Sequence, residues 1–286
     1  MAFAVATKTS ANVASAAPLL DAGGYNARIV QIIDLGLQPG SAQYPEPVYK
    51  ILMKFECLDE FMCEVNEDGS IKTVKNEDGD YENIPIVNKP RWFDFEFTYN
   101  PDGFMGERSH IYKLMQAVDA FEVAPSDDFP GHPAKQLPEL IGEPLVINLI
   151  HHMAKTGKNA GKKVNKISSF AAMKGKDKKV APPLVNDSLF FDMDNPDVTA
   201  FNKLPKGNPY CPQERIKSGM EFHKSKLAAL LNGVEYTGNS ESDKPSDEDV
   251  DEAMRAEMEA QRKAKEKTIN AQTGADEEAA KPVVPF

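Results

Sequence analysis

Cations and aromatic side chains recur together along this chain, and their combination indicates one kind of chemistry. Arg91 and Trp92 are neighbours, and Lys50 and Lys54 fall on one side of an alternating segment. Fixed cations displace counterions from a polyanion, and aromatic rings stack on unpaired bases. The residues that we predict to line a polyanion groove are Lys50, Lys54, Arg91, Trp92, Arg108, Lys155, Lys158, Lys162, Lys163 and Lys166.

The aromatic stripe next to Trp92 allows two interpretations. Phe93, Phe95 and Phe97 alternate with polar residues, which is typical of a core-facing strand. The same stripe could instead be a stacking platform for unpaired bases. Trp92 projects from the opposite face among polar neighbours, so it is the preferred stacking residue.

Metal and catalytic chemistry find little support in the sequence. His151 and His152 are adjacent in a predicted strand and so point to opposite faces, which disfavours one shared ion. The repeated Asn-Glu-Asp-Gly at 66–69 and 76–79 predicts hairpin turns, and no twelve-residue calcium loop closes with a Glu. The glycine-punctuated run 155–163 lacks the phosphate-loop pattern. We therefore predict no metal, no cofactor and no enzymatic activity.

The elements that would position these residues are mostly strands. Apolar and alternating patterns predict strands over 25–37, 48–58, 91–99, 144–153 and 164–170, and helical spacing with Ser109 as cap predicts a helix over 109–121. This succession predicts a mainly β protein with inserted helices. A small antiparallel barrel of the OB type, with its helix before the last strand pair, fits the order. A flat sandwich is the alternative.

Charge and composition divide the chain into four parts. The chain of 286 residues has a formal charge of −11. Residues 151–181 hold nine Lys and one Asp, whereas 237–286 hold 13 acidic and seven basic residues, so the charge is polarised. We predict a disordered arm over 1–18, an OB-like domain over 19–182, an extension packing on it over 183–236, and a flexible acidic tail over 237–286.

The cysteine pattern and the lengths of the apolar runs indicate the cellular compartment. Cys57, Cys63 and Cys211 form neither a CxxC motif nor an even disulfide set, which indicates reduced thiols. The apolar runs in residues 1–17 are too short for a signal sequence or a membrane span. We expect a cytoplasmic protein without membrane contact, in the host cytoplasm if it is viral.

Several short motifs resemble the single-stranded-DNA-binding proteins of tailed bacteriophages. They are the predicted first strand at 24–36, the strand that begins with Arg91-Trp92, the start of a strand at 141–144, and the short apolar segments at 191–192 and 201–205. The resemblance covers about 24–220 and implies an OB-fold replication protein. The tail is similar to that of bacterial single-stranded-DNA-binding proteins in ending on Pro285-Phe286, although residues 279–284 replace the acidic ones expected before it.

Two functions remain open from the sequence. The first is a non-catalytic protein that coats and protects unpaired DNA during phage replication or recombination. Its tail would compete for the groove and recruit phage or host replication proteins through Val284, Pro285 and Phe286. The second is a virion structural or assembly protein without DNA affinity, in which the tail only adds solubility.

Overall fold

The computed structural model describes residues 15–41, 44–101, 103, 105–123, 132–155 and 159–233. All of them lie in the first of two units into which the chain divides, Met1–Glu235 and Tyr236–Phe286. The predicted acidic tail, including Val284, Pro285 and Phe286, lies outside the described residues, as does Lys158. Among the helices that are described, none is long and apolar enough to cross a membrane.

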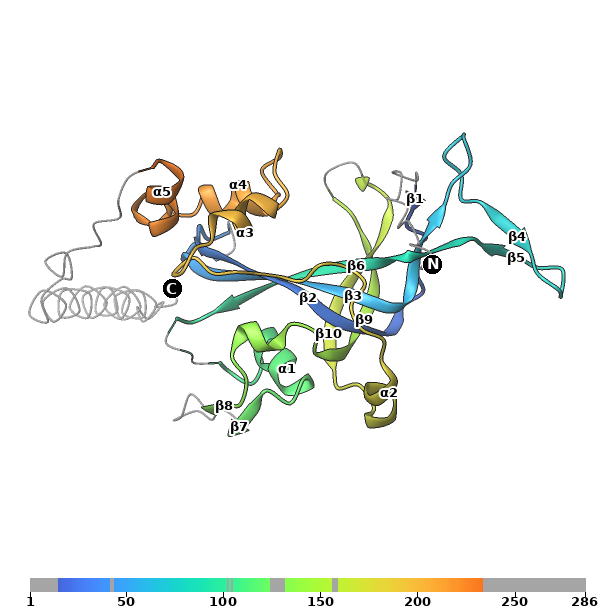
Figure 1. Ribbon diagram of the computed structural model, residues 1–286, viewed down its shortest axis with the longest axis horizontal. Helices are drawn as coiled ribbons and strands as arrows, with labels where there is room; N and C mark the ends of the chain where they lie inside the picture. The colour runs from blue at the N-terminus through green and yellow to red at the C-terminus, as the bar shows by residue number, and fades with distance from the viewer. Residues whose placement is uncertain are drawn as a thin grey trace, which may run out of the picture. The chain divides into compact units, whose positions relative to one another are not determined.

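One large, mostly antiparallel sheet dominates the structure (Figure 1). Its main path runs β1-β3-β2-β9-β10, with β6 paired to β3 and β11 paired in parallel to β2. The prediction of a mainly β fold with inserted helices is therefore confirmed. The strands are β1 (Ser15–Ala16), β2 (Gly23–Gln38), β3 (Val48–Glu64), β6 (Pro85–Tyr99), β9 (Pro144–Met153), β10 (Lys163–Ala171) and β11 (Leu189–Phe191).

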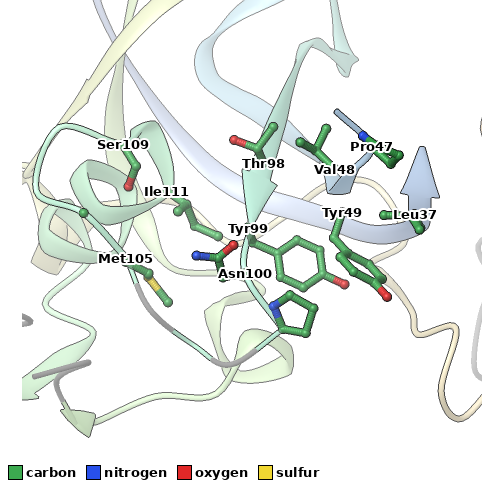
Figure 2. Close-up of a pocket in the computed structure, with 12 residues that line it drawn as sticks. Leu37, Pro47, Val48, Tyr49, Thr98, Tyr99, Asn100, Met105, Ser109 and Ile111 are labelled. Atoms are coloured by element: carbon green, nitrogen blue, oxygen red, sulfur yellow. The ribbon is translucent and has the colours of Figure 1, made fainter. Parts of the chain in front are cut away.

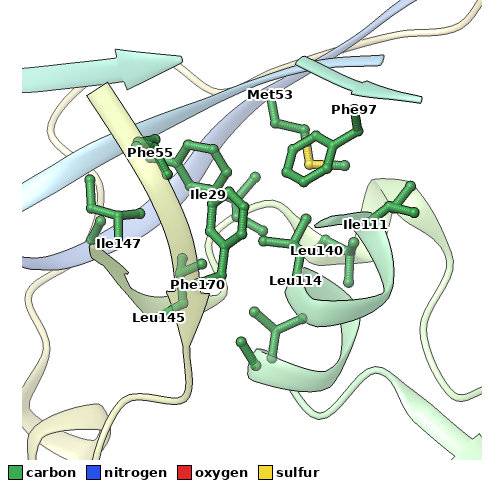
Figure 3. Packing of buried hydrophobic residues seen from close by; sticks show 14 of the residues in the cluster. Ile29, Met53, Phe55, Phe97, Ile111, Leu114, Leu140, Leu145, Ile147 and Phe170 are labelled. Carbon is green, nitrogen blue, oxygen red and sulfur yellow. The ribbon is translucent and has the colours of Figure 1, made fainter. Parts of the chain in front are cut away.

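The first core lies between the curved sheet and helix α1 (His110–Ala117) (Figure 3). Ser109 caps α1 by accepting a hydrogen bond from the Tyr112 amide at 3.2 Å, as the sequence predicts. Residues two apart on one strand share a face, so β3 contributes Ile51, Met53 and Phe55. The largest side chains that complete this core are Ile29, Phe97, Leu114, Leu140, Leu145, Ile147 and Phe170.

A second core lies on the opposite face of β2 and β3. Ile33 and Leu35 from β2 and Leu52 from β3 pack here, which explains why the apolar run of β2 is too dense for one buried face. The covering elements are β11, α3 (Val198–Lys203), α4 (Pro212–Lys217), η3 (Phe222–Lys224) and α5 (Lys226–Leu231). They contribute Phe191, Phe201, Leu204, Ile216 and Leu227. The segment 183–233 thus lies on the sheet.

The sheet does not close into a continuous barrel. No strand ladder joins β6 to β10 in the part of the chain that is described. Aromatic rings span this opening instead: the Phe170 ring centroid lies 5.3 Å from those of Phe95 and Phe97. The opening between β6 and β10 is therefore sealed at its base by side chains rather than by backbone hydrogen bonds.

A hairpin projects from the far ends of β3 and β6 (Figure 1). It contains β4 (Thr73–Lys75) and β5 (Tyr81–Asn83), and two turns shape it. Gly69 and Gly79 adopt φ of 81° and 91°, which L side chains rarely tolerate, so the two Asn-Glu-Asp-Gly repeats do form turns. The predicted pair of hairpin turns is confirmed.

Short elements complete the structure, and one of them changes the predicted N-terminal boundary. These are β7 (Phe121–Val123), β8 (His132–Pro133), η1 (Leu137–Leu140) and α2 (Gly175–Val180). At the N-terminus, Ser15 and Ala16 pair with Glu64 and Cys63 of β3. Residues 15–18 of the predicted arm are thus ordered against the sheet, and residues 1–14 lie outside the described part.

Candidate nucleic-acid interface

The predicted cation face of β3 is largely neutralised. Lys50 Nζ lies 2.7 Å from a carboxylate oxygen of Glu96 on β6, and Arg215 from α4 binds the other oxygen. Burial alone would raise the pKa of Glu96, but the hydrogen bonds and charges of Arg215 and Lys50 outweigh it and lower the pKa. Lys50 therefore belongs to an ion-pair network that holds α4 against the sheet.

Lys54 and Trp92 lie beside a buried carboxylate on the same face. Lys54 Nζ stands 5.5 Å from the Trp92 ring centroid, and burial lowers the pKa of this lysine although Asp94 opposes the shift. The buried Glu56 accepts hydrogen bonds from the amides of Val185 and Asn186 at 2.7 and 3.1 Å. The segment at 185–186 is therefore fixed beside Lys54 and Trp92 on this face.

Arg91, another of the predicted cations, is engaged within the fold. It is buried, and its guanidinium donates to the Pro18 carbonyl and stands 5.1 Å from the Phe93 ring centroid. Burial lowers its pKa, while the neighbouring Cys57 and Glu60 act in the opposite direction. Arg91 thus anchors the ordered N-terminal segment to β6 and does not offer a free charge to a ligand.

The remaining predicted cations are exposed. Lys155, Lys162, Lys163 and Lys166 belong to the β9–β10 hairpin, where the Ala154 amide donates to the Lys162 carbonyl at 3.0 Å. Arg108 is exposed in the turn before α1. Within the described residues, none of these five cations forms an ion pair.

The sequence analysis missed the group at the opening between β6 and β10. The half-buried Phe95 ring lies 4.9 Å from the exposed His110 ring, centroid to centroid. Burial lowers the pKa of His110, and the charges of Lys113 and Lys166 lower it further. The Phe95–His110 ring pair thus lies beside α1, and the charges of Lys113 on α1 and Lys166 on β10 act on its imidazole.

A sequence signal for this group does exist. Ser109 was already assigned as the helix cap, and His110 and Lys113 lie three residues apart, so a helix starting there places them on one face. Pairing this helix face with Phe95 and Lys166 requires knowing which strands flank the opening. That is a tertiary relation, which spacing along the chain does not reveal.

A cavity of about 470 Å³ lies at the end of β6, beyond α1 (Figure 2). The Tyr49 and Tyr99 rings, 5.7 Å apart between centroids, stand side by side in its wall. Both hydroxyls donate to carboxylates: Tyr99 to Asp34 at 3.3 Å and Tyr49 to Glu221 at 3.0 Å. Burial, reinforced by Asp34, raises the pKa of Tyr99, so its hydroxyl stays protonated. The wall is aromatic with carboxylates behind it, which disfavours a phosphate inside.

Metal ligation has no support in the described part of the chain, where no group of three or more His, Cys, Asp or Glu side chains converges. His151 Nε2 lies 2.9 Å from the Leu20 carbonyl oxygen, so this ring is held by the backbone. Cys57, Cys63 and Cys211 are free thiols. Comparison with protein-family models and with curated proteins finds no match to this chain, so its function has to be inferred from the chemistry of these side chains.

Proposed function

We propose that this chain is a non-catalytic single-stranded-DNA-binding protein. The observation that carries the proposal is the aromatic pair Phe95–His110 beside β6, in which His110 is exposed, together with the exposed lysines Lys113 of α1 and Lys166 of β10. Stacking on such rings gives a preference for unpaired bases, and the lysines contribute the salt-dependent attraction for phosphates. The interface differs from the one expected from sequence, because it follows β10 and α1 rather than the outer face of β3.

Exposed cations extend this interface in both directions. Lys162 and Lys163 continue it along β10 towards the hairpin tip, and Lys174 and Lys176 continue it past the other end of the strand. A nine-residue strand rises about 3.3 Å per residue and so spans roughly 30 Å. That length suits a few nucleotides, in keeping with the small site sizes of OB-type modules.

An OB-like barrel is part of the proposal. The strand order β6-β3-β2-β9-β10, with α1 inserted between β6 and β9, supports a five-stranded barrel that remains partly open. The opening would lie between β6 and β10, next to the proposed stacking pair. A resemblance to phage single-stranded-DNA-binding proteins supports a role in phage replication or recombination. The tail residues Val284, Pro285 and Phe286 would recruit replication proteins in the cytoplasm of the host.

Fluorescence anisotropy with a labelled single strand and its duplex, over a salt series, tests the proposal. We expect tight binding to the single strand only. Replacing Lys113 and Lys166 together by Ala should make the slope of log K against log salt shallower by about 1.4, since each phosphate contact contributes roughly 0.7. Replacing the exposed Lys206 and Lys224 of the extension is the matched control and should leave the slope unchanged.

Two results would overturn the proposal. Absence of binding to either DNA at low salt would favour the virion-assembly alternative, for which the mass of the oligomer is the next measurement. Equal losses from the Lys113/Lys166 and Lys206/Lys224 variants would place the interface elsewhere, because diffuse surface charge would then account for binding.

A further inference from the structure

The hairpin beyond β3 and β6 is strongly acidic and mostly exposed. We call residues 64–84 the acidic arm. It holds seven Asp or Glu and two Lys, a net charge of −5. Every residue of β4 and β5 is exposed, and Val74 and Tyr81 expose 53% and 74% of their surface. Val74 lies opposite Glu82 and Tyr81 lies opposite Lys75, so each face of this ribbon exposes one apolar side chain. Two strands of three residues are marginal as an isolated hairpin, so contact with a partner would stabilise them.

The β9–β10 hairpin has the opposite character. We call residues 150–166 the basic arm. It holds five Lys and no Asp or Glu, a net charge of +5. Ile150 and Met153 expose 44% and 50% of their surface on opposite faces of its β9 strand. Each face of each arm therefore exposes one apolar side chain, and the net charges of the two arms are equal in size and opposite in sign.

The two arms do not satisfy each other within one chain. Among the described residues, no hydrogen bond or ion pair joins an arm to the other: the one salt bridge within the acidic arm links Lys72 to Glu64 at 3.1 Å, and the basic arm has none. Glu67, Glu77 and Asp78 at the acidic turns are exposed and form no ion pair with any described residue. Both arms are thus available to a partner.

We propose that the acidic arm of one copy binds the basic arm of a second copy of this chain. Tyr81 would pack on Met153, which lies opposite Lys163 in the β9–β10 ladder, and the carboxylates at the acidic turns would pair with Lys155, Lys162 and Lys163. Complementary charges select the pairing and speed the encounter, while the apolar contacts add affinity. The contact forms without DNA, so it goes beyond the proposed function and does not depend on it.

Charge reversal in the full-length chain tests the contact by sedimentation velocity without DNA. One variant carries Glu67→Lys, Glu77→Lys and Asp78→Lys, which changes its acidic arm from −5 to +1. The matched variant carries Lys155→Glu, Lys162→Glu and Lys163→Glu, which changes its basic arm from +5 to −1. We expect the natural chain to associate at low salt, each variant alone to sediment as a monomer, and an equimolar mixture of the two to associate again.

Three outcomes would overturn the contact between arms. The natural chain could remain monomeric at every concentration, or the mixture could fail to associate. Loss of association in the basic-arm variant alone would show that another acidic segment, such as the tail, occupies the basic arm. Tyr81→Ser is a second probe, expected to weaken association without changing charge. The acidic-arm variant retains Phe95, His110, Lys113 and Lys166, so its affinity for a short single strand reports on the proposed DNA interface alone. Its sedimentation without DNA reports on the contact between arms, and the two proposals can therefore fail independently.

Discussion

Some charged side chains in this protein bind the backbone of distant segments and others are exposed, and their positions in the sequence do not distinguish the two kinds. Arg28 donates to the carbonyls of Ala181 and Pro182 at 2.8 and 2.6 Å, and Arg91 donates to the Pro18 carbonyl. Glu56 binds two backbone amides of the extension in the same manner. These side chains fix distant segments against the sheet, whereas Lys113 and Lys166 remain exposed.

Replacing Glu56 by Gln should destabilise the fold. The buried carboxylate accepts from two amides and from the Asn186 side chain, and the amide group of Gln would point a donor at one of them. We expect a loss of about 1–3 kcal/mol in the free energy of unfolding, the usual cost of an unsatisfied buried polar group. Urea denaturation measures it, with the exposed Glu122→Gln as control. Equal stability of the two variants would contradict the role of Glu56 as an anchor.

His110 should make DNA binding depend on pH. Burial, Lys113 and Lys166 hold its pKa below the ordinary 6.5, and phosphates that neutralise these lysines would raise it in the complex. The complex then binds more protons than the free protein, so the affinity for DNA rises as the pH falls from 7.5 towards the pKa of His110. His110→Gln should flatten the profile measured by anisotropy. His223→Gln, an exposed residue of the extension, should retain it; a flat profile in the natural protein would refute the effect.

At the scale of elements, the segment 183–233 decides which face of the sheet is open. Leu52 of β3 packs with Phe191 and Ile216 of this segment, and Glu56 binds its backbone. The strand β11, the first element of this segment, pairs in parallel with β2 although the two strands are more than 150 residues apart in sequence. The segment that covers this face of the sheet therefore comes near the end of the described chain. The side of β3 that carries Lys50 and Lys54 is thereby covered, and its other side forms the first core, so a ligand is left with the exposed surface of β10 and α1.

Trp92 and His110 should respond differently to truncation. We expect Trp92→Ala to lower stability but to leave the affinity for a single strand nearly unchanged, because Trp92 packs against Lys54 on the face covered by the extension. His110→Ala should weaken binding by roughly fivefold to a hundredfold, since a stacked base contributes about 1–3 kcal/mol. Thermal unfolding and anisotropy separate the two effects. A larger affinity loss for Trp92→Ala than for His110→Ala would restore the face expected from sequence.

Local pattern was sufficient for the elements but not for the interface. Alternation in Ile51, Met53 and Phe55 predicted β3, and the Ser109 cap predicted α1, because both signals lie within a few residues of one another. The role of Arg91 could not be predicted, since its partner Pro18 is 73 residues away. The stacking pair Phe95–His110 depends likewise on the position of α1 against β6. The sequence shows which side chains are cationic. Only the tertiary structure shows which of them bind the backbone of another segment and which are exposed.

At the scale of the whole molecule, charge is distributed so that parts of one chain can compete for the same cations. The acidic arm and the tail carry −5 and −6, and residues 151–181 carry +8. A polyanion such as DNA must displace any acidic segment that occupies these lysines. Under the proposed function, such competition would make the affinity for DNA depend on salt beyond the direct phosphate contacts.

Removing the tail should therefore tighten DNA binding at low salt. In a chain ending at Gly233, residues 234–286 with their 14 acidic and seven basic side chains are absent. We expect about threefold to tenfold tighter binding at 50 mM salt, because each surface charge pair released is worth roughly 0.2–1 kcal/mol. Salt screens these pairs, so the difference should vanish near 0.5 M. A full-length chain in which the acidic residues of 241–252 are replaced by Asn and Gln is the matched control, and it should bind like the truncated chain. If it binds like the natural chain instead, the bulk of the tail rather than its charge obstructs the interface, and the competition between tail and DNA is not electrostatic.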